Sequence, residues 1–224
     1  MNRPDARFES DTFKAVLEAV EKEEGASAPK KRLAILAALD CFAEFGFDGT
    51  STKVIAERAG IGEATIFRHF PSKKALLLRI VQPVVRHILT PAAEQEAHDL
   101  VARHGGDRRA VLRAVMLSRI YFMRMYEPLV KIVIQEALVN PDLRTVLVKE
   151  ATPLFNQITG VVTMFGPQTG LERERFFRTL GSFIAGYFLH SAVLAPDREW
   201  SDEAEVDFML TVLFDGFDAT LGQG

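Results

Sequence analysis

Residues 32–78 read RLAILAALDCFAEFGFDGTSTKVIAERAGIGEATIFRHFPSKKALLL. Apolar side chains recur in this stretch at intervals of three and four residues, a spacing typical of helices packed on a common core. Gly46 ends the first apolar stripe, and Gly60 permits the left-handed backbone that a tight interhelical turn requires. The stretch therefore predicts four consecutive helices, over about 31–45, 52–59, 63–69 and from 72 onward.

The same stretch resembles the N-terminal domain of the TetR family of transcriptional repressors along its whole length. The matching features are an A-x-x-x-F-A-E-x-G-F/Y-x-x-T-S/T opening, followed by I-A-x-x-A-G-I, A-T-I-F-x-H-F and P-S-K-x-A-L. The resemblance implies a helix-turn-helix in which helix 52–59 crosses the phosphate backbone and helix 63–69 enters the major groove. We expect Ile66 and Phe70 to face inward. A three-helix bundle without a DNA function is the alternative.

Five positions match phosphate contacts of this family. They are Ser51, Thr52, Thr65, His69 and Lys73. Hydroxyl groups and free backbone amides at a helix N-terminus suit a phosphate, and a lysine at the start of the next helix adds positive charge. The resemblance therefore implies that the head is anchored on the DNA backbone at several points.

Three further positions match residues that reach base edges. Lys53 can contact a base or a phosphate, although it can equally be a solvated lysine. Glu63 can accept a hydrogen bond from cytosine N4, and Ala64 can touch a thymine methyl group. A carboxylate also simply suits a helix N-terminus, so both interpretations of Glu63 remain open.

Three other residues of helix 63–69 and its cap complete the expected DNA-facing set. Phe67 stands where the family usually has tyrosine, so the contact made by that hydroxyl is lost. Gly62 replaces the common N-cap serine, which should weaken the cap by only a few tenths of a kcal/mol. Arg68 is free to reach the groove or its walls.

Charge is unevenly distributed along the chain. Residues 30–75 contain eight basic and five acidic side chains, a net +3, within a protein whose overall net charge is −3. A positive segment on an otherwise acidic chain is where a polyanion is expected to bind.

An N-terminal extension, residues 1–29, precedes the head. Phe13, Val16, Leu17 and Val20 follow helical spacing within 10–23, and the Gly25–Pro29 segment reads as a linker. We therefore predict an amphipathic helix with nothing local to pack on. The predicted boundaries are 1–29 for the extension, 30–76 for the helix-turn-helix domain and 77–224 for a ligand-binding and dimerisation domain.

The region from 77 to 224 is predicted to be a helical body, so the whole chain is all-α. The resemblance beyond residue 80 is one of architecture only, and it implies that helices 171–194 and 202–221 form a homodimer interface. The expected interface residues are Gly181, Ala185, Phe208, Val212, Leu213 and Phe217. The alternative is that these apolar stripes close the core of the monomer.

A ligand pocket is expected between the helix from 72 onward and the helices at about 107–126, 141–165 and 171–194. Its candidate lining residues combine apolar bulk with a few neutral polar groups, as small-molecule sites do: Tyr121, Met125, Phe155, Asn156, Thr159, Phe183, Tyr187 and His190. Residues 151–171 carry no formal charge, which favours a neutral, hydrophobic effector. Ordinary core packing is the alternative for each residue taken singly.

Other classes of function find no support in the sequence. No nucleophile elbow, phosphate-cradling glycine loop or paired metal ligands occur, so we expect neither an enzyme nor a bound cofactor or metal. His87, His98 and His104 do not share a helix face. The single cysteine, Cys41, indicates a reducing compartment, and no stretch reads as a signal peptide or membrane span, so a cytoplasmic protein is expected.

These features together predict a ligand-responsive repressor. It would bind palindromic double-stranded DNA as a homodimer and be released by a small, hydrophobic effector. The alternative is a helix-turn-helix regulator controlled by a protein partner.

Overall fold

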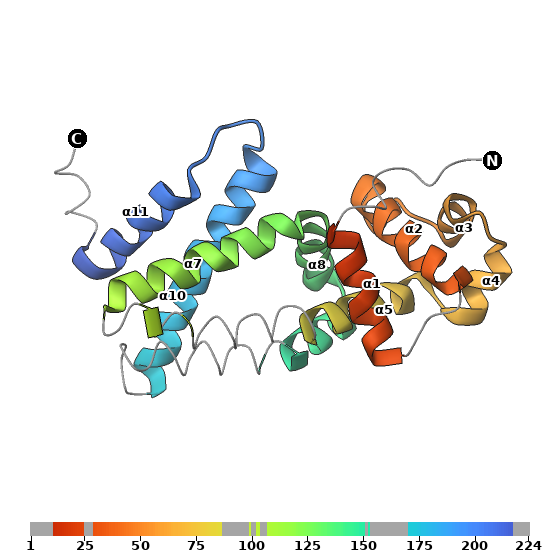
Figure 1. Ribbon diagram of the computed structural model, residues 1–224, viewed down its shortest axis with the longest axis horizontal. Helices are drawn as coiled ribbons and strands as arrows, with labels where there is room; N and C mark the ends of the chain where they lie inside the picture. The colour runs from red at the N-terminus through yellow and green to blue at the C-terminus, as the bar shows by residue number, and fades with distance from the viewer. Residues whose placement is uncertain are drawn as a thin grey trace. The chain divides into compact units, whose positions relative to one another are not determined.

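The computed structural model describes residues 11–24, 29–86, 107–150 and 170–216, together with the isolated positions 99, 102, 103 and 152. All regular secondary structure within these ranges is helical (Figure 1), which confirms the all-α prediction. The chain divides into two compact units. The first comprises Met1–Ala92 and Tyr126–Leu154, and the second comprises Ala93–Met125 and Phe155–Gly224.

The head lies in the first unit and consists of α2 (Pro29–Phe45), α3 (Thr52–Ala59) and α4 (Glu63–His69). Helix α2 packs on both α3 and α4, and α3 packs on α4. The three helices and the cap residue after α4 bury side chains in a shared core, formed by Ala34, Ile35, Ala38, Cys41, Phe42, Ile55, Ile66 and Phe70. The inward orientation predicted for Ile66 and Phe70 is confirmed.

Two glycines permit the turns between these helices. Gly60 has φ 64°, and its N–H donates to the Glu57 carbonyl oxygen at 3.2 Å, which closes α3 with a left-handed residue as predicted. Gly49 lies in the turn between α2 and α3, where an added Cβ would come within 2.4 Å of the Phe45 carbonyl oxygen. Only glycine fits this close approach without a backbone shift.

Helix α5 (Lys73–Val84) follows the head and begins at an N-cap serine, Ser72, whose hydroxyl accepts from the Ala75 N–H at 3.0 Å. Pro83 lies inside the helix, which continues past it into a π-type turn at 85–86. Proline has no N–H, so the backbone of α5 lacks one helical hydrogen bond at this position.

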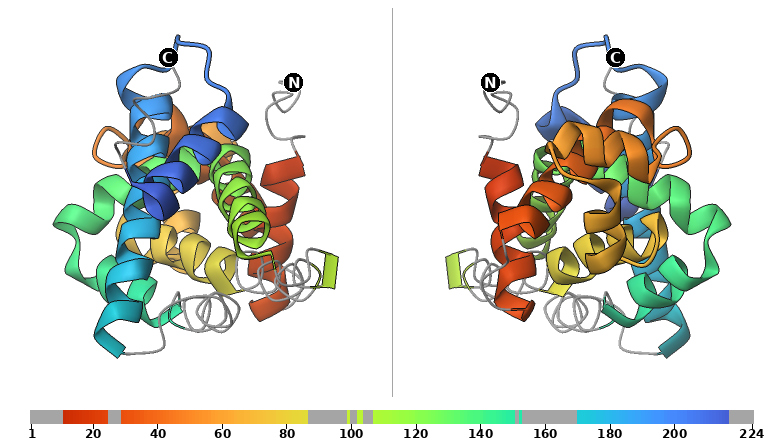
Figure 2. Two further views of the ribbon diagram at one scale, coloured as in Figure 1. Left: turned by 90° about the vertical axis from the view of Figure 1, so that its left-hand side faces the viewer. Right: turned by 90° about the vertical axis from the view of Figure 1, so that its right-hand side faces the viewer.

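Helix α1 (Asp11–Glu24) packs against α5 and α2 within the first unit, and Figure 2 shows it beside them. Its apolar stripe is covered: Val16, Leu17, Ala19 and Val20 are all buried. The prediction that this helix would have nothing local to pack on is therefore wrong. Helix α5 lies about 50 residues further along the chain, and sequence spacing alone gave no sign that it presents the matching apolar face.

Helix α8 (Glu127–Val139) and the helical residues 141–150 also belong to the first unit. Helix α8 packs on α2 and buries Leu129 and Ile132. Glu150 accepts two hydrogen bonds from the Arg86 guanidinium, at 2.6 and 2.9 Å, and one from Gln82 at 3.1 Å. The region predicted as one body domain, 77–224, is thus shared between the two units.

The second unit contains α7 (Arg108–Met125), α10 (Gly170–Leu189), the π-helical turn η3 (His190–Leu194) and α11 (Asp202–Asp215). Helix α7 packs against both α10 and α11 around an apolar cluster that includes Leu112, Met116, Ile120, Leu180, Ile184, Val206 and Leu210. None of the helices in the described ranges is both long enough and apolar enough to cross a membrane.

Candidate functional site

The start of α3 presents hydroxyl and amide groups at the surface of the head. Ser51 is the N-cap residue, and its Oγ accepts from the Val54 N–H at 3.2 Å, as serine commonly does at this position. Ser51 and Lys53 are exposed, and Thr52 is half-buried. This end of the helix carries the positive pole of its dipole and therefore suits an anion.

Helix α4 exposes one face of its short length. Ala64, Phe67 and Arg68 are exposed, and the Phe67 ring remains 49% accessible. The N-cap residue Gly62 makes no side-chain hydrogen bond to the helix, which agrees with the weak cap predicted for it. An exposed phenyl ring beside an arginine is available to a partner surface, and the structure places both residues on the helix expected to read DNA.

The other residues predicted on α4 are only partly accessible. Glu63, Thr65 and His69 are each half-buried, at the edges of the exposed face. The His69 and Phe70 rings lie 6.3 Å apart, between centroids, in a tilted arrangement. The predicted contacts of Thr65 and His69 with phosphate stay predictions.

A hydrogen bond joins the two helices of the motif. The Thr52 hydroxyl donates to Glu63 Oε1 at 2.6 Å, across eleven residues of sequence. Both residues were singled out from the sequence, Thr52 for phosphate and Glu63 for a base, but no pattern indicated that they contact each other. Such a contact depends on the angle between α3 and α4, which residue spacing does not report.

Lys73 makes its contacts inside the first unit. Its Nζ donates to the Phe47 and Thr50 carbonyl oxygens at 2.5 and 2.8 Å, and lies 4.1 Å from the centroid of the Phe47 ring. An ammonium group has three hydrogens, so one remains for another acceptor. The predicted phosphate contact of Lys73 is thus still a prediction, and the structure adds a second role, that of holding the turn before α3.

Two acidic side chains of the head, Asp40 and Glu44, share an ion pair with Arg58. Arg58 donates to Asp40 at 2.5 Å and to Glu44 at 2.6 Å. The hydrogen bond that Arg58 donates to Glu44 raises the pKa of Arg58, against a smaller opposing effect of burial, and the bond to Asp40 raises it further. On α3 and α4 the exposed charged residues are then two basic ones, Lys53 and Arg68, and one acidic one, Glu57.

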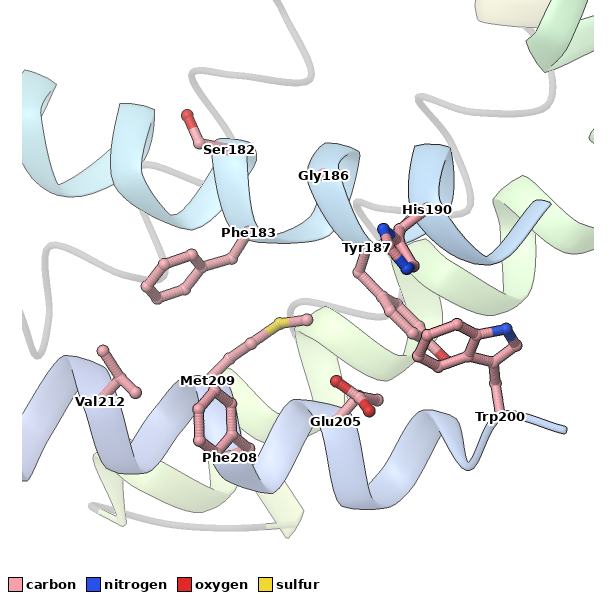
Figure 3. Close-up of a pocket in the computed structure, with 10 residues that line it drawn as sticks. All are labelled: Ser182, Phe183, Gly186, Tyr187, His190, Trp200, Glu205, Phe208, Met209 and Val212. Atoms are coloured by element: carbon pink, nitrogen blue, oxygen red, sulfur yellow. The ribbon is translucent and has the colours of Figure 1, made fainter. Parts of the chain in front are cut away.

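The second candidate site is a groove of about 560 Å³ between α10 and α11, shown in Figure 3. It is lined by Ser182, Phe183, Gly186, Tyr187, His190, Trp200, Glu205, Phe208, Met209 and Val212. Three of these were predicted for a ligand pocket (Phe183, Tyr187 and His190), and two for a dimer interface (Phe208 and Val212). The structure thus brings residues of both predicted sets together on one surface.

The remaining residues of those two sets lie elsewhere. Tyr121, which is 66% exposed, and Met125 do not line the groove. Leu213 packs against the core of its own unit, as the alternative interpretation expected, whereas Gly181 and Ala185 are exposed. Phe155, Asn156, Thr159 and Phe217 lie outside the described residues.

A polar cluster fixes one end of the groove. Asp202 accepts from the Tyr187 hydroxyl at 2.5 Å and from Arg124 Nη2 at 2.6 Å, which links α11 to α10 and α7. Burial and the Asp202 carboxylate raise the pKa of Tyr187 to about 12. Burial acts to raise the pKa of Asp202, but hydrogen bonds from Arg124 and Tyr187 more than offset it, so this pKa is lowered. Tyr187 and Trp200 form an edge-to-face pair with ring centroids 5.8 Å apart.

Known proteins resemble this chain in two ways: some are similar in sequence over a part of the chain, and others are similar in fold over most of it. Residues 34–80 match the family described as bacterial regulatory proteins of the tetR family. The HTH-type transcriptional regulator RutR of Escherichia coli is 39% identical over 70 residues, which cover 31% of this chain and 33% of RutR. The class A tetracycline repressor protein from transposon 1721 of E. coli is 31% identical over 85 residues, 38% of this chain and 39% of that protein. The chain thus matches only about a third of the length of these relatives.

Solved structures extend the similarity of the fold to most of the chain. The TetR-family transcriptional regulator PfmR from Thermus thermophilus aligns with a TM-score of 0.60 at 17% identity, covering 84% of this chain and 97% of PfmR. The transcriptional regulator FadR from Bacillus subtilis, in complex with stearoyl-CoA, aligns with a TM-score of 0.59 at 20% identity. The alignment covers 83% of this chain and 98% of FadR.

The family match falls on residues within α2–α5, the elements that form the head and its exposed face, whereas the likeness to PfmR and FadR is one of fold over most of the chain. Residues 34–80 therefore form a domain of the tetR family of bacterial regulatory proteins.

Proposed function

We propose that this regulator is a repressor that binds a palindromic DNA operator as a homodimer and leaves it when a small hydrophobic molecule binds. The observation that carries the proposal is the exposed face of α4, with Ala64, Phe67 and Arg68 accessible beside the capped N-terminus of α3. A helix-turn-helix with this exposure suits the major groove, with α3 against the phosphate backbone.

The surface formed by α10, η3 and α11 supports the homodimer. Phe208 is 48% exposed and Leu194 is 67% exposed, and Leu189 and Val193 add further accessible apolar area. Removing such area from water is favourable by about 25 cal/mol per Å². Gly181 and Gly186 leave open space on α10, since an added Cβ there meets no atom within 4 Å. Small side chains of this kind allow close approach of a partner helix.

We accordingly assign the groove between α10 and α11 to the partner subunit and not to the effector. Phe183, Tyr187 and His190 would then contact the second copy of the chain. A two-fold interface needs the same surface on both subunits, and we propose the exposed face of α10 and α11 as that surface.

The effector is proposed to be hydrophobic because residues 151–171 are uncharged and rich in apolar side chains. A fold neighbour, FadR from Bacillus subtilis, is in complex with stearoyl-CoA, a ligand with a long apolar chain, and this supports a hydrophobic effector. We extend only the hydrophobic character of that ligand to the present protein.

The experiment is selection of bound DNA from a random pool, followed by a screen for compounds that release it. The expected result is a two-fold symmetric site, bound by two chains, with affinity falling steeply as salt rises because phosphate contacts release counterions. Release by apolar compounds supports the effector class, whereas binding that only a protein partner relieves would contradict it. Absence of any selected sequence would overturn the DNA-binding role.

A further inference from the structure

The bond between Thr52 and Glu63 separates the roles of two neighbouring hydroxyl groups. A threonine hydroxyl carries one hydrogen, and in Thr52 that hydrogen is donated to Glu63 Oε1 at 2.6 Å. It cannot be donated to a phosphate oxygen at the same time. The Ser51 hydroxyl acts only as an acceptor, from the Val54 N–H, so its own hydrogen remains for a phosphate. Ser51 is therefore suited to the DNA backbone, and Thr52 is suited to Glu63.

Glu63 occupies a position that makes its orientation matter. It is the first residue of α4, directly after Gly62, and it is half-buried at the edge of the exposed face. A glutamate has three rotatable side-chain bonds, and the contact with Thr52 restricts them. Oε1 is occupied by Thr52, while Oε2 makes no hydrogen bond to any of the described residues. One acceptor atom of a fixed carboxylate is thus available at the N-terminus of the recognition helix.

The chemistry of a carboxylate limits what this atom can contact. An ionised carboxylate accepts hydrogen bonds only, and it repels phosphate groups. In the major groove the donors are the amino groups of cytosine, N4, and adenine, N6. Adenine places the N7 acceptor beside its amino group, which repels a carboxylate, whereas cytosine has no acceptor there. The geometry therefore favours cytosine over the other three bases.

Building on the proposed DNA-binding function, we infer that Thr52 is a positioning residue which orients Glu63 to read a cytosine in each operator half-site. The competing explanation is that the bond only fastens α3 to α4. These explanations differ in what they predict for base preference. A fastening bond changes stability and affinity for every sequence together, whereas a positioning bond changes the ranking of one base against the others.

The test compares four variants on the selected operator and on operators substituted at each single position. Thr52→Val removes the hydroxyl at constant shape, and Thr52→Ser keeps it. Glu63→Gln changes the acceptor to an amide, and Ser51→Ala is the matched control on the neighbouring hydroxyl. Each variant is also melted thermally, so that a loss of folding is recognised as such.

The wild-type protein is expected to prefer cytosine by about tenfold at one position of each half-site, in the range given by specific base contacts. Thr52→Val should reduce that preference to less than threefold, and Thr52→Ser should keep it. Glu63→Gln should move the preference toward adenine, whose N6 and N7 pair with an amide. Ser51→Ala should weaken binding to all sequences in proportion.

Two results would overturn the inference while leaving the proposed function intact. One is operator binding by the wild-type protein with no cytosine preference that Glu63→Gln alters. The other is a Thr52→Val variant with lower melting temperature and weaker binding but an unchanged ranking of bases. If the wild-type protein selects no DNA at all, the proposed function itself fails and this inference fails with it.

Discussion

The exposed face of the head and the exposed face of α10 and α11 differ in chemistry. The head exposes Ser51, Lys53, Glu57 and Arg68, which water solvates well, together with the Phe67 ring. The α10–α11 face instead exposes Phe208 and Leu194 around an open groove. A polar face can remain in water until its partner arrives, whereas a contiguous apolar face favours being covered permanently. The first face is suited to reversible binding, and the second to stable association.

The largest expected effect comes from placing a charge on the apolar face. Phe208→Glu should dissociate the homodimer, because a buried unpaired carboxylate is strongly unfavourable at an interface. Operator affinity should fall by about a hundredfold or more, equivalent to about 2.7 kcal/mol. Analytical ultracentrifugation and operator titration measure the two effects.

Leu138→Glu is the matched control, because Leu138 is an equally apolar and more exposed residue on α8 in the other unit. That variant should remain dimeric. A monomeric Leu138→Glu, or a dimeric Phe208→Glu that still binds the operator, would show that the permanent association uses another surface.

The next effect tests whether α1 is part of the first unit. Val20 is fully buried, so Val20→Ala should lower the free energy of unfolding by about 2 kcal/mol through lost burial and a residual cavity. Denaturant unfolding measures this change. Glu18→Ala, on the exposed side of the same helix, should alter it by less than about 0.5 kcal/mol. If both variants changed the free energy of unfolding by the same negligible amount, the packing of α1 would not contribute to the stability of the first unit.

A smaller effect is expected at Lys73, which belongs both to the turn before α3 and to the predicted phosphate contacts. Lys73→Ala should weaken binding to specific and random DNA alike by about tenfold, or about 1.4 kcal/mol. Lys74→Ala removes a solvent-exposed pair with Asp142 and should change little. A change in base preference without a loss of affinity would contradict this assignment of Lys73.

The smallest expected effect comes from removing the carboxylate of Asp202, the acidic partner of Arg124. The pKa of Asp202 is lowered in the folded protein, so its contribution to stability is present above its unfolded pKa and is lost as pH falls through the folded value. Asp202→Asn should therefore destabilise the protein at neutral pH by about 1 kcal/mol, given that both partners are partly exposed.

That difference between wild type and Asp202→Asn should shrink as pH falls below about 4, the ordinary range of an aspartate. Thermal melts of both proteins across pH 3–7 check the result. A difference that is constant with pH would assign the effect to packing and not to the ion pair.

Features that depend on neighbours in sequence were predictable, and features that depend on distant contacts were not. The Ser51 cap, the left-handed Gly60 and the inward Ile66 follow from local backbone chemistry and helical spacing. The packing of α1 on α5 and the bond from Thr52 to Glu63 depend on how separate helices meet. For the same reason Phe183 and Phe208 were placed in two different sites, whereas the angle between α10 and α11 brings both to one groove.

Under the inference that Glu63 reads a base, the contact from Thr52 to Glu63 also sets the smallest segment to transplant when changing which DNA a protein of this fold recognises. Grafting α4 alone would move the glutamate without the hydroxyl that holds it, and the recipient's residue at the start of its preceding helix would decide the outcome. A graft of residues 51–69 carries the N-cap serine, the threonine, the Gly60 turn and the glutamate together. Engineers of new operator specificities in this fold should therefore exchange both helices of the motif as one cassette.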